Sequence, residues 1–149
     1  MKSESQNGEI SDLMNDVLKR IILLNKEIES YFGMSSARIL TLLAFTEKKI
    51  MYMNELSKAM SLTTSTSTRM IDSLVKEGFV ERGHDKFDRR LVTVGLTGKG
   101  KKVAKDIKAF RDKYFESIED KVKGDGKEAM VMSLKTLIDA FGDFRSQLR

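Results

Sequence analysis

Apolar side chains recur every three or four positions near both ends of the chain, which is the spacing of one face of an amphipathic helix. The first such row lies in residues 10–32, where Gly33 is expected to end the helix, and the last lies in residues 103–149. Residues 39–45 form a shorter and denser apolar row, which predicts a central helix. Residues 49–53 are too short to classify and are treated as a connector. The pattern therefore predicts a mainly helical protein.

Two short helical segments follow, separated by only a few residues. The first covers residues 54–60, with Asn54 as its candidate N-cap, and Gly78 is expected to end the second. Residues 63–68 are an unbroken run of hydroxyl side chains, which compete for backbone hydrogen bonds and therefore suit a helix N-terminus, with Thr63 as the cap. Two helices joined in this way predict a helix-turn-helix, whose second helix enters the major groove of DNA. The alternative is a Ser/Thr-rich loop that merely precedes a core helix.

The second of these helices has an apolar face and a polar face. The face expected to be buried comprises Ser67, Met70, Ile71, Leu74 and Val75. The outward side comprises Thr64, Ser65, Thr68, Arg69, Asp72 and Lys76, with Thr66 at the margin of the two faces. Short hydroxyl side chains let a helix lie close to base edges and phosphates, and Arg69 can bind a guanine or a phosphate. The hydroxyl residues and Arg69 are therefore predicted to contact DNA.

After this helix the spacing of apolar residues changes from helical to alternating. Residues 79–84 and 90–96 are two β-prone runs, joined by a charged turn over residues 85–89. Alternate residues of the second run are apolar, which fits a strand with one buried face. A hairpin directly after the DNA-reading helix of a helix-turn-helix, its recognition helix, makes a winged helix. The basic residues Lys86 and Arg89 at the tip of this hairpin can reach phosphates or the minor groove of DNA.

The charge distribution singles out the same part of the chain. Residues 35–102 hold 13 basic and 7 acidic side chains, a net charge of +6, whereas the whole chain of 149 residues has a net charge of +5. The segments before and after carry −2 and +1. Such a local excess favours a polyanionic partner for the winged-helix module, although composition alone is equally typical of a solvated basic surface.

Several other function classes are excluded by residues that the sequence lacks. It has no Cys and only one His, so disulfides, thiolate nucleophiles and His clusters for transition metals are absent, and no cofactor is expected. No nucleophile–base pair or phosphate-binding loop has a useful spacing, which argues against an enzyme. No apolar run approaches the roughly 18 residues that cross a bilayer, and no signal peptide is visible, so the expected location is the cytoplasm, with no membrane partner.

Residues 56–100 closely resemble the winged-helix core of the MarR family of bacterial transcriptional regulators. The segment STSTRMIDSLVKEGFVER is similar to the family's recognition helix and first wing strand, and DRRLVTVGLTGKG is similar to its wing and following helix. The resemblance implies that Arg90 contacts the minor groove and that Asp88 orients the wing, because they match the family's Asp-x-Arg motif. Arg89 holds the variable middle position of that motif. The tip departs from the family in having no Pro and in placing Phe87 among charged residues.

The helices near both ends are predicted to expose more apolar surface than the winged module can cover. Thr97 is a candidate cap for a long helix that ends near Gly124, and a last helix follows. Together with the family resemblance, this predicts a twofold homodimer, which would read a pseudopalindromic operator. The alternative is that these helices fold back on their own module. The expected interface residues are Ile10, Leu13, Val17, Ile21, Leu134, Leu137, Ile138 and Phe141.

The predicted fold is a single MarR-like domain over residues 1–149, mainly α with a small β-hairpin wing, in which dimerisation helices flank the winged helix-turn-helix of residues 35–102. The predicted function is a sequence-specific regulator that binds double-stranded DNA, a dimeric repressor responsive to a small ligand. The family resemblance implies that this ligand is a phenolic or other small compound that weakens DNA binding. One alternative is a nonspecific architectural DNA-binding protein, marked by steep salt dependence without a preferred site. Another is a winged-helix protein that acts through protein contacts.

Overall fold

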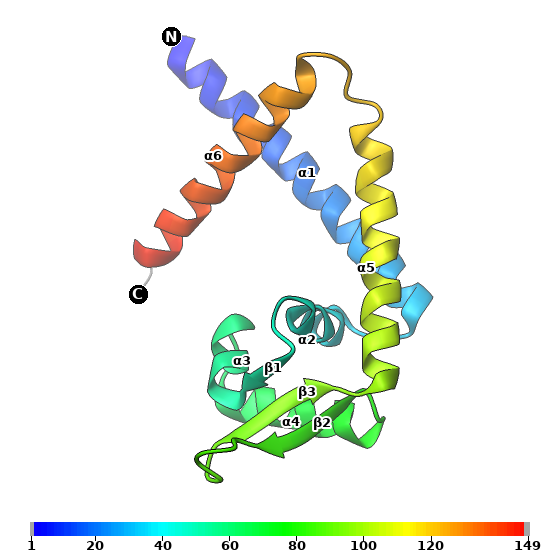
Figure 1. Cartoon of the computed structure of the whole chain (residues 1–149). Coiled ribbons are helices and arrows are strands. Elements are labelled where there is room, and N and C mark those ends of the chain that lie inside the picture. Colours follow the sequence, from blue (N-terminus) through cyan, green and yellow to red (C-terminus); the bar gives the residue numbers. More distant parts are fainter. Residues whose placement is uncertain (1, 148–149) are drawn as a thin grey trace. The chain divides into compact units, whose positions relative to one another are not determined.

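The computed structural model describes residues 2–147. Over this range the chain forms six helices and three strands (Figure 1). They group into two compact units, Met1–Phe110 and Arg111–Arg149, and the boundary falls within one long helix. The expected fold class, mainly helical with a small β wing, is confirmed. The single domain over the whole chain stays a prediction.

The first helix is longer than the apolar pattern predicted. α1 spans Lys2–Phe32, so the expected start at residue 10 is wrong. Residues 2–9 are mostly polar and contain no Pro, so they continue the helix without lengthening the apolar row. Gly33 ends α1 as predicted, with a φ of +62° that glycine adopts readily. α2, Ser36–Glu47, is the predicted central helix.

The segment treated as a connector contains a strand. β1, Ile50–Tyr52, is paired antiparallel with β3, Val92–Leu96, so that Met51 lies opposite Val94. β3 is also paired with β2, Val80–His84, and the sheet order is β1-β3-β2. The partner of β1 lies far along the chain, which is why a strand of three residues could not be classified from its own pattern.

The helix-turn-helix begins with α3, Met53–Ala59. The predicted cap of this helix is wrong, because Asn54 lies inside α3 rather than before it. The N-cap position is occupied by Tyr52, whose N–H donates to the Glu55 carboxylate at 2.9 Å. Glu55, in the first turn of α3, therefore provides a hydrogen-bond acceptor for the backbone N–H at the start of the helix.

The second helix of the pair, α4, spans Thr64–Lys76. Its predicted cap is confirmed, because Thr63 Oγ1 accepts a hydrogen bond from the Thr66 N–H at 3.3 Å. Gly78 follows the helix with a φ of +77°, the left-handed conformation that ends many helices. The hydroxyl run is thus the start of a helix, and the alternative of a Ser/Thr-rich loop is wrong.

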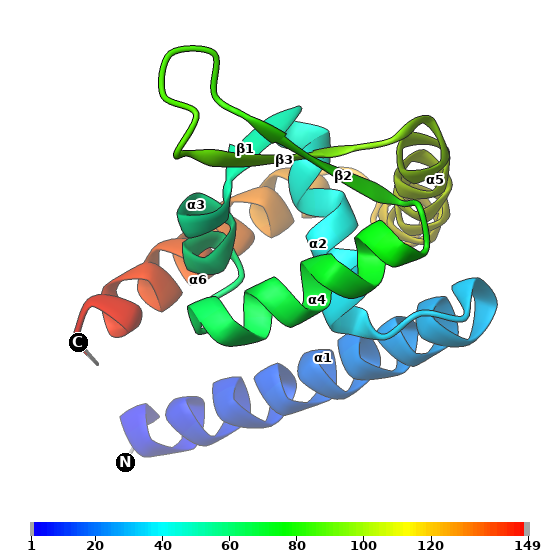
Figure 2. The ribbon, with the colours of Figure 1, turned by 90° about the horizontal axis from the view of Figure 1, so that it is seen from below.

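One apolar core holds the elements of Met1–Phe110 together. Its fully buried large side chains come from α1 to α5 and from the sheet, namely Ile28, Leu42, Leu56, Ile71, Leu74, Val80, Val94 and Ile107. The predicted alternation on β3 is confirmed, since Val94 and Leu96 are buried and Val92 is half-buried. Figure 2 shows α4 beside the sheet and the β2–β3 loop extending beyond the strand ends. The core therefore joins the two predicted DNA-binding elements in one packed module.

The long helix α5, Gly98–Glu119, begins at its predicted cap. Thr97 Oγ1 accepts a hydrogen bond from the Gly100 N–H at 3.1 Å and donates one to the Gly78 carbonyl at 2.6 Å. The backbone of Gly100 passes so close to Phe79, the residue before β2, that a Cβ at Gly100 would lie 1.9 Å from the Phe79 carbonyl oxygen. The start of α5 is therefore fixed against the end of α4.

The second unit contains the C-terminal part of α5 and all of α6, Gly126–Gln147. An ion pair spans the connection between the two helices, with Lys127 Nζ 3.1 Å from Glu119 Oε1. The predicted last helix is confirmed. Its apolar row is largely open to solvent, because Leu134, Ile138 and Phe141 are exposed and Leu137 is half-buried.

Candidate nucleic-acid interface

The outer face of α4 carries the helical residues predicted to meet DNA. Thr64, Ser65, Thr66 and Arg69 are exposed, and Thr68 is half-buried. On the opposite face Ser67, Ile71 and Leu74 are buried as predicted, and Met70 is half-buried. The prediction that Val75 belongs to the buried face is wrong, because Val75 is exposed. Val75 follows Leu74 by one residue and therefore lies about 100° further around the helix. The start of α4 thus presents a polar surface that rests on the core.

Local hydrogen bonds order the hydroxyl groups at this helix start. The hydroxyl oxygens of Thr63 and Thr66 are 2.9 Å apart, and Thr68 donates to the Thr64 carbonyl at 2.8 Å. Because a hydroxyl has two acceptor lone pairs besides its donor, Thr68 can still accept a hydrogen bond. Backbone N–H groups in the first turn of a helix lack helical partners and attract phosphate. The helix start can therefore bind phosphate and present short polar groups to base edges.

An ion pair neutralises the acidic residue on the outer side of α4. Arg82 Nη1 on β2 lies 2.7 Å from Asp72 Oδ1. An unpaired carboxylate at this position would repel the phosphate backbone. Sequence analysis placed Asp72 on the outer side but missed its partner, because the two residues belong to different elements.

Two basic residues hold the C-terminal end of α4. Arg38 on α2 is paired with the Glu77 carboxylate, and this hydrogen bond lowers the pKa of Glu77. Lys99 Nζ donates to the Glu77 carbonyl at 2.8 Å and lies 4.2 Å from the centre of the Phe79 ring. These contacts position α4 relative to α2 and α5.

The tip of the wing is organised by a single carboxylate. Asp85 Oδ1 accepts hydrogen bonds from the backbone N–H groups of Phe87 and Asp88, at 2.8 and 3.1 Å. Its Oδ2 accepts one from the Tyr52 hydroxyl at 2.6 Å. The hydrogen bond from Tyr52 has the largest effect in lowering the pKa of Asp85, and the two backbone hydrogen bonds lower it further. In turn, the Asp85 carboxylate raises the pKa of Tyr52. The strand that sequence analysis could not classify therefore anchors the wing.

Asp88 holds the guanidinium of Arg90. Asp88 Oδ1 accepts from the Arg90 backbone N–H and from Nε, both at 3.0 Å, and Oδ2 accepts from Nη2 at 3.0 Å. The side-chain contact lowers the pKa of Asp88 and raises that of Arg90. The Arg90 side chain is nevertheless 90% exposed, so its outer N–H groups face solvent. Lys86 and Arg89 are also exposed in this loop.

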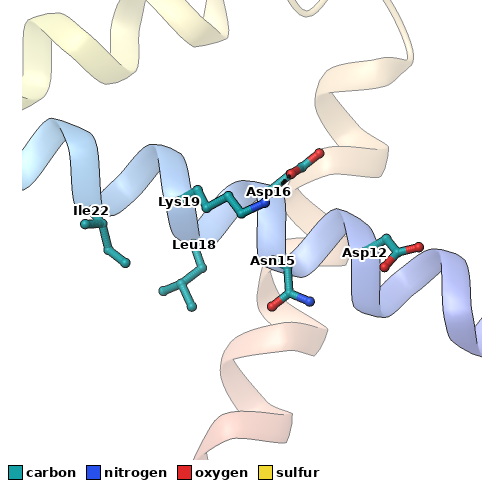
Figure 3. A pocket seen from close by; sticks show the side chains of 6 residues that line it. All are labelled: Asp12, Asn15, Asp16, Leu18, Lys19 and Ile22. Carbon is teal, nitrogen blue, oxygen red and sulfur yellow. Dashed lines mark ion pairs between the residues drawn. The ribbon is translucent and has the colours of Figure 1, made fainter.

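A shallow hollow lies on the exposed face of α1 (Figure 3). Its lining residues are Asp12, Asn15, Asp16, Leu18, Lys19 and Ile22. Because all six belong to one helix, the hollow is a feature of that face rather than an enclosed ligand site. Among the described residues, no group of three or more His, Asp or Glu side chains is placed to hold a metal ion. Within residues 2–147, no helix is long and apolar enough to cross a membrane.

Comparison with known proteins assigns the chain to a family. Residues 33–92, which include α4 and the wing tip, match the model of the MarR family. Over 123 residues the chain is 31% identical to the HTH-type transcriptional repressor YetL of Bacillus subtilis (strain 168), in an alignment that covers 79% of this chain and 72% of the relative. The chain belongs to the MarR family. It is therefore a DNA-binding transcription regulator and not an enzyme.

Solved structures show that the MarR fold extends over almost the whole chain. FabT of Streptococcus pneumoniae, crystallised in complex with DNA, has a TM-score of 0.83 and 21% identity, with 91% of this chain and 97% of that chain covered. A MarR family protein from Bacillus stearothermophilus also has a TM-score of 0.83, with 19% identity and coverage of 93% and 97%. At these identities the likeness concerns the fold alone.

Proposed function

We propose that this MarR-family chain is a homodimeric, sequence-specific repressor that acts in the cytoplasm on double-stranded, pseudopalindromic DNA. The observation that carries the proposal is the joint presentation of two surfaces by one packed core. The first is the polar start of α4, with Thr64, Ser65 and Arg69 exposed. The second is the basic wing tip, where Asp88 holds an exposed Arg90.

In this proposal α4 enters the major groove with its N-terminus first. The short side chains of Thr64, Ser65, Thr66 and Thr68 allow the helix backbone to approach the base edges. Arg69 lies one turn further along the same face, where its guanidinium reaches a guanine or a phosphate. The Asp72–Arg82 ion pair supports this placement, because it removes a repulsive charge beside the phosphates.

The wing is proposed to contact the adjacent minor groove. Arg90 enters the groove, Asp88 fixes its direction, and Lys86 and Arg89 bind the phosphates on either side. A guanidinium that is already held in one direction loses less conformational freedom on binding. The Tyr52–Asp85 hydrogen bond supports this role, because it connects the tip to the sheet.

The exposed apolar rows are proposed to form the dimer interface. On α1 this row comprises Ile10, Leu13, Val17 and Ile21, whose exposed fractions lie between 45% and 59%. On α6 it comprises Leu134, Leu137, Ile138 and Phe141. Contiguous apolar surface of this kind marks an interaction site, and a second copy offers a matching apolar row. Two recognition helices related by a twofold axis would read half-sites about one helical turn apart.

A small ligand, of the phenolic kind that the family resemblance implies, is proposed to weaken DNA binding. The dimer is expected to have one conformation that fits the operator and another that does not. To weaken DNA binding, the ligand must have a higher affinity for the conformation that does not fit. α5 connects the wing to α6 along the chain, so a change in its direction would alter the distance between the two recognition helices.

Arg69→Ala tests the major-groove contact. If Arg69 reads a base, we expect the substitution to weaken binding to the selected operator by about 1 to 3 kcal/mol and to leave binding to a scrambled duplex nearly unchanged. If Arg69 holds a phosphate, both duplexes lose affinity alike. A titration of both duplexes by fluorescence anisotropy distinguishes these cases. Lys105→Ala, which removes an exposed charge from α5, is the control, and Arg69→Ala binding that equals the control would contradict the placement of α4.

A further inference from the structure

The most exposed large apolar side chain in the described part of the molecule lies at the wing tip. Phe87 is 98% exposed, whereas the next such side chain, Tyr31, is 72% exposed. Leaving a phenyl ring entirely in water forgoes the free energy that its burial would release. The position therefore has no role in the packing of the single chain, and the ring is available to a partner.

The backbone presents Phe87 in an ordered turn. Its N–H donates to Asp85 Oδ1 at 2.8 Å, and the same carboxylate is bound to Tyr52 on β1. At the other side of the loop, His84 Nδ1 lies 2.8 Å from the Arg89 carbonyl oxygen. The ring thus projects from a loop that is closed by hydrogen bonds at both sides, which lowers the entropic cost of inserting it into a partner.

The surroundings of Phe87 favour a nucleic acid as that partner. Lys86, Arg89 and Arg90 are exposed in the same loop. The two carboxylates beside the ring already have partners, since Asp85 accepts three hydrogen bonds and Asp88 holds Arg90. A fully exposed ring in a loop that also carries three exposed cations matches DNA, whose phosphates flank a groove floored by stacked bases.

We propose that Phe87 inserts into the minor groove and partly unstacks one base step beside the half-site that α4 reads. This inference rests on the proposed function, because the wing must lie on DNA for the ring to reach a base step. Apolar wedges of this kind open a step and kink the duplex, and flexible pyrimidine–purine steps open at the lowest cost. Phe87 is then a specificity-determining residue that makes no hydrogen bond to a base. The operator is expected to carry a TA or CA step at the position of each wing.

The test uses the full chain and the duplex that it selects from sheared DNA. 2-Aminopurine replaces adenine at successive positions of the operator flanks, because its fluorescence rises when it is unstacked. Phe87→Ala removes the wedge, whereas Phe87→Leu keeps an apolar side chain. Ile50→Ala is the matched control, since it truncates an exposed apolar residue that lies away from the wing tip, 59% exposed on β1.

We expect the wild-type protein to raise the fluorescence at one step in each flank. Phe87→Ala should abolish that rise and weaken operator binding by about tenfold to a hundredfold, while Phe87→Leu retains most of both and Ile50→Ala changes neither. Replacing the flexible step by a stiff one should weaken the wild type and leave Phe87→Ala unchanged.

Two outcomes would overturn the inference alone. In the first, a duplex is selected but Phe87→Ala binds it like the wild type and keeps the fluorescence rise. In the second, Phe87→Ala changes the sedimentation of the free protein, which would place the ring in a protein interface. If the wild type selects no duplex at all, the proposed function fails together with the inference.

Discussion

Replacing Ile138 and Phe141 together by glutamate is expected to give a monomer that has lost operator binding. Both side chains lie on α6 and are exposed in the single chain, at 67% and 56%, so the substitution costs little within one chain. In a dimer the same positions would bury two carboxylates per subunit in apolar surface, which is strongly unfavourable. Separating two linked half-site contacts should lower operator affinity by about a hundredfold to ten-thousandfold.

Sedimentation velocity and a binding titration check this prediction together. The control is Lys135→Glu, an exposed position of α6 outside the apolar row, which changes the net charge by the same amount as the double substitution. Far-UV circular dichroism should show that both variants remain helical. A double variant that still sediments as a dimer would show that α6 does not form the interface.

Gly100→Ala is expected to destabilise the winged module by about 3 kcal/mol or more. The added Cβ would lie 1.9 Å from the Phe79 carbonyl oxygen and 2.9 Å from the carbonyl carbon, and both are backbone atoms. Because the main chain cannot rotate away as a side chain can, α5 and the backbone of Phe79 must separate. Thr97 and the Lys99 contact to the end of α4 would be displaced with them.

Gly98→Ala is the matched control for this substitution, and chemical denaturation measures both. Gly98 also lies in the first turn of α5, but no atom lies within 4 Å of a Cβ built there. Alanine at this position should leave stability unchanged or raise it by less than about 1 kcal/mol, because it is the better helix former. Equal stability of the two variants would contradict the close approach of α5 to the backbone of Phe79.

Local chemistry explains why much of the fold could be predicted. Thr63 caps α4 because a hydroxyl satisfies a backbone N–H only three residues away, and Gly78 ends it because the left-handed conformation is cheap for glycine. The buried side of β3 follows from simple alternation at Val92, Val94 and Leu96. Each of these signals lies within a few residues of the feature that it predicts.

The missed features depend on contacts between distant parts of the chain. β1 is a strand because β3 pairs with it, and Tyr52 anchors the wing because the fold brings Asp85 beside it. The Asp72–Arg82 pair likewise joins a helix to a strand. No periodicity marks such partners in advance. The early start of α1 was missed for a different reason, since residues 2–9 add no apolar side chain to the row.

The most direct test of sequence-specific DNA binding is to incubate the protein with sheared genomic DNA at about physiological salt and to sequence the bound fragments. We predict enrichment of a pseudopalindrome whose half-sites lie about one helical turn apart, and its loss with Arg90→Ala, because the wing contact is removed. Recovery of DNA without any enriched sequence would contradict this function and indicate a nonspecific architectural binder. Equal enrichment by Arg90→Ala would exclude the wing from DNA recognition.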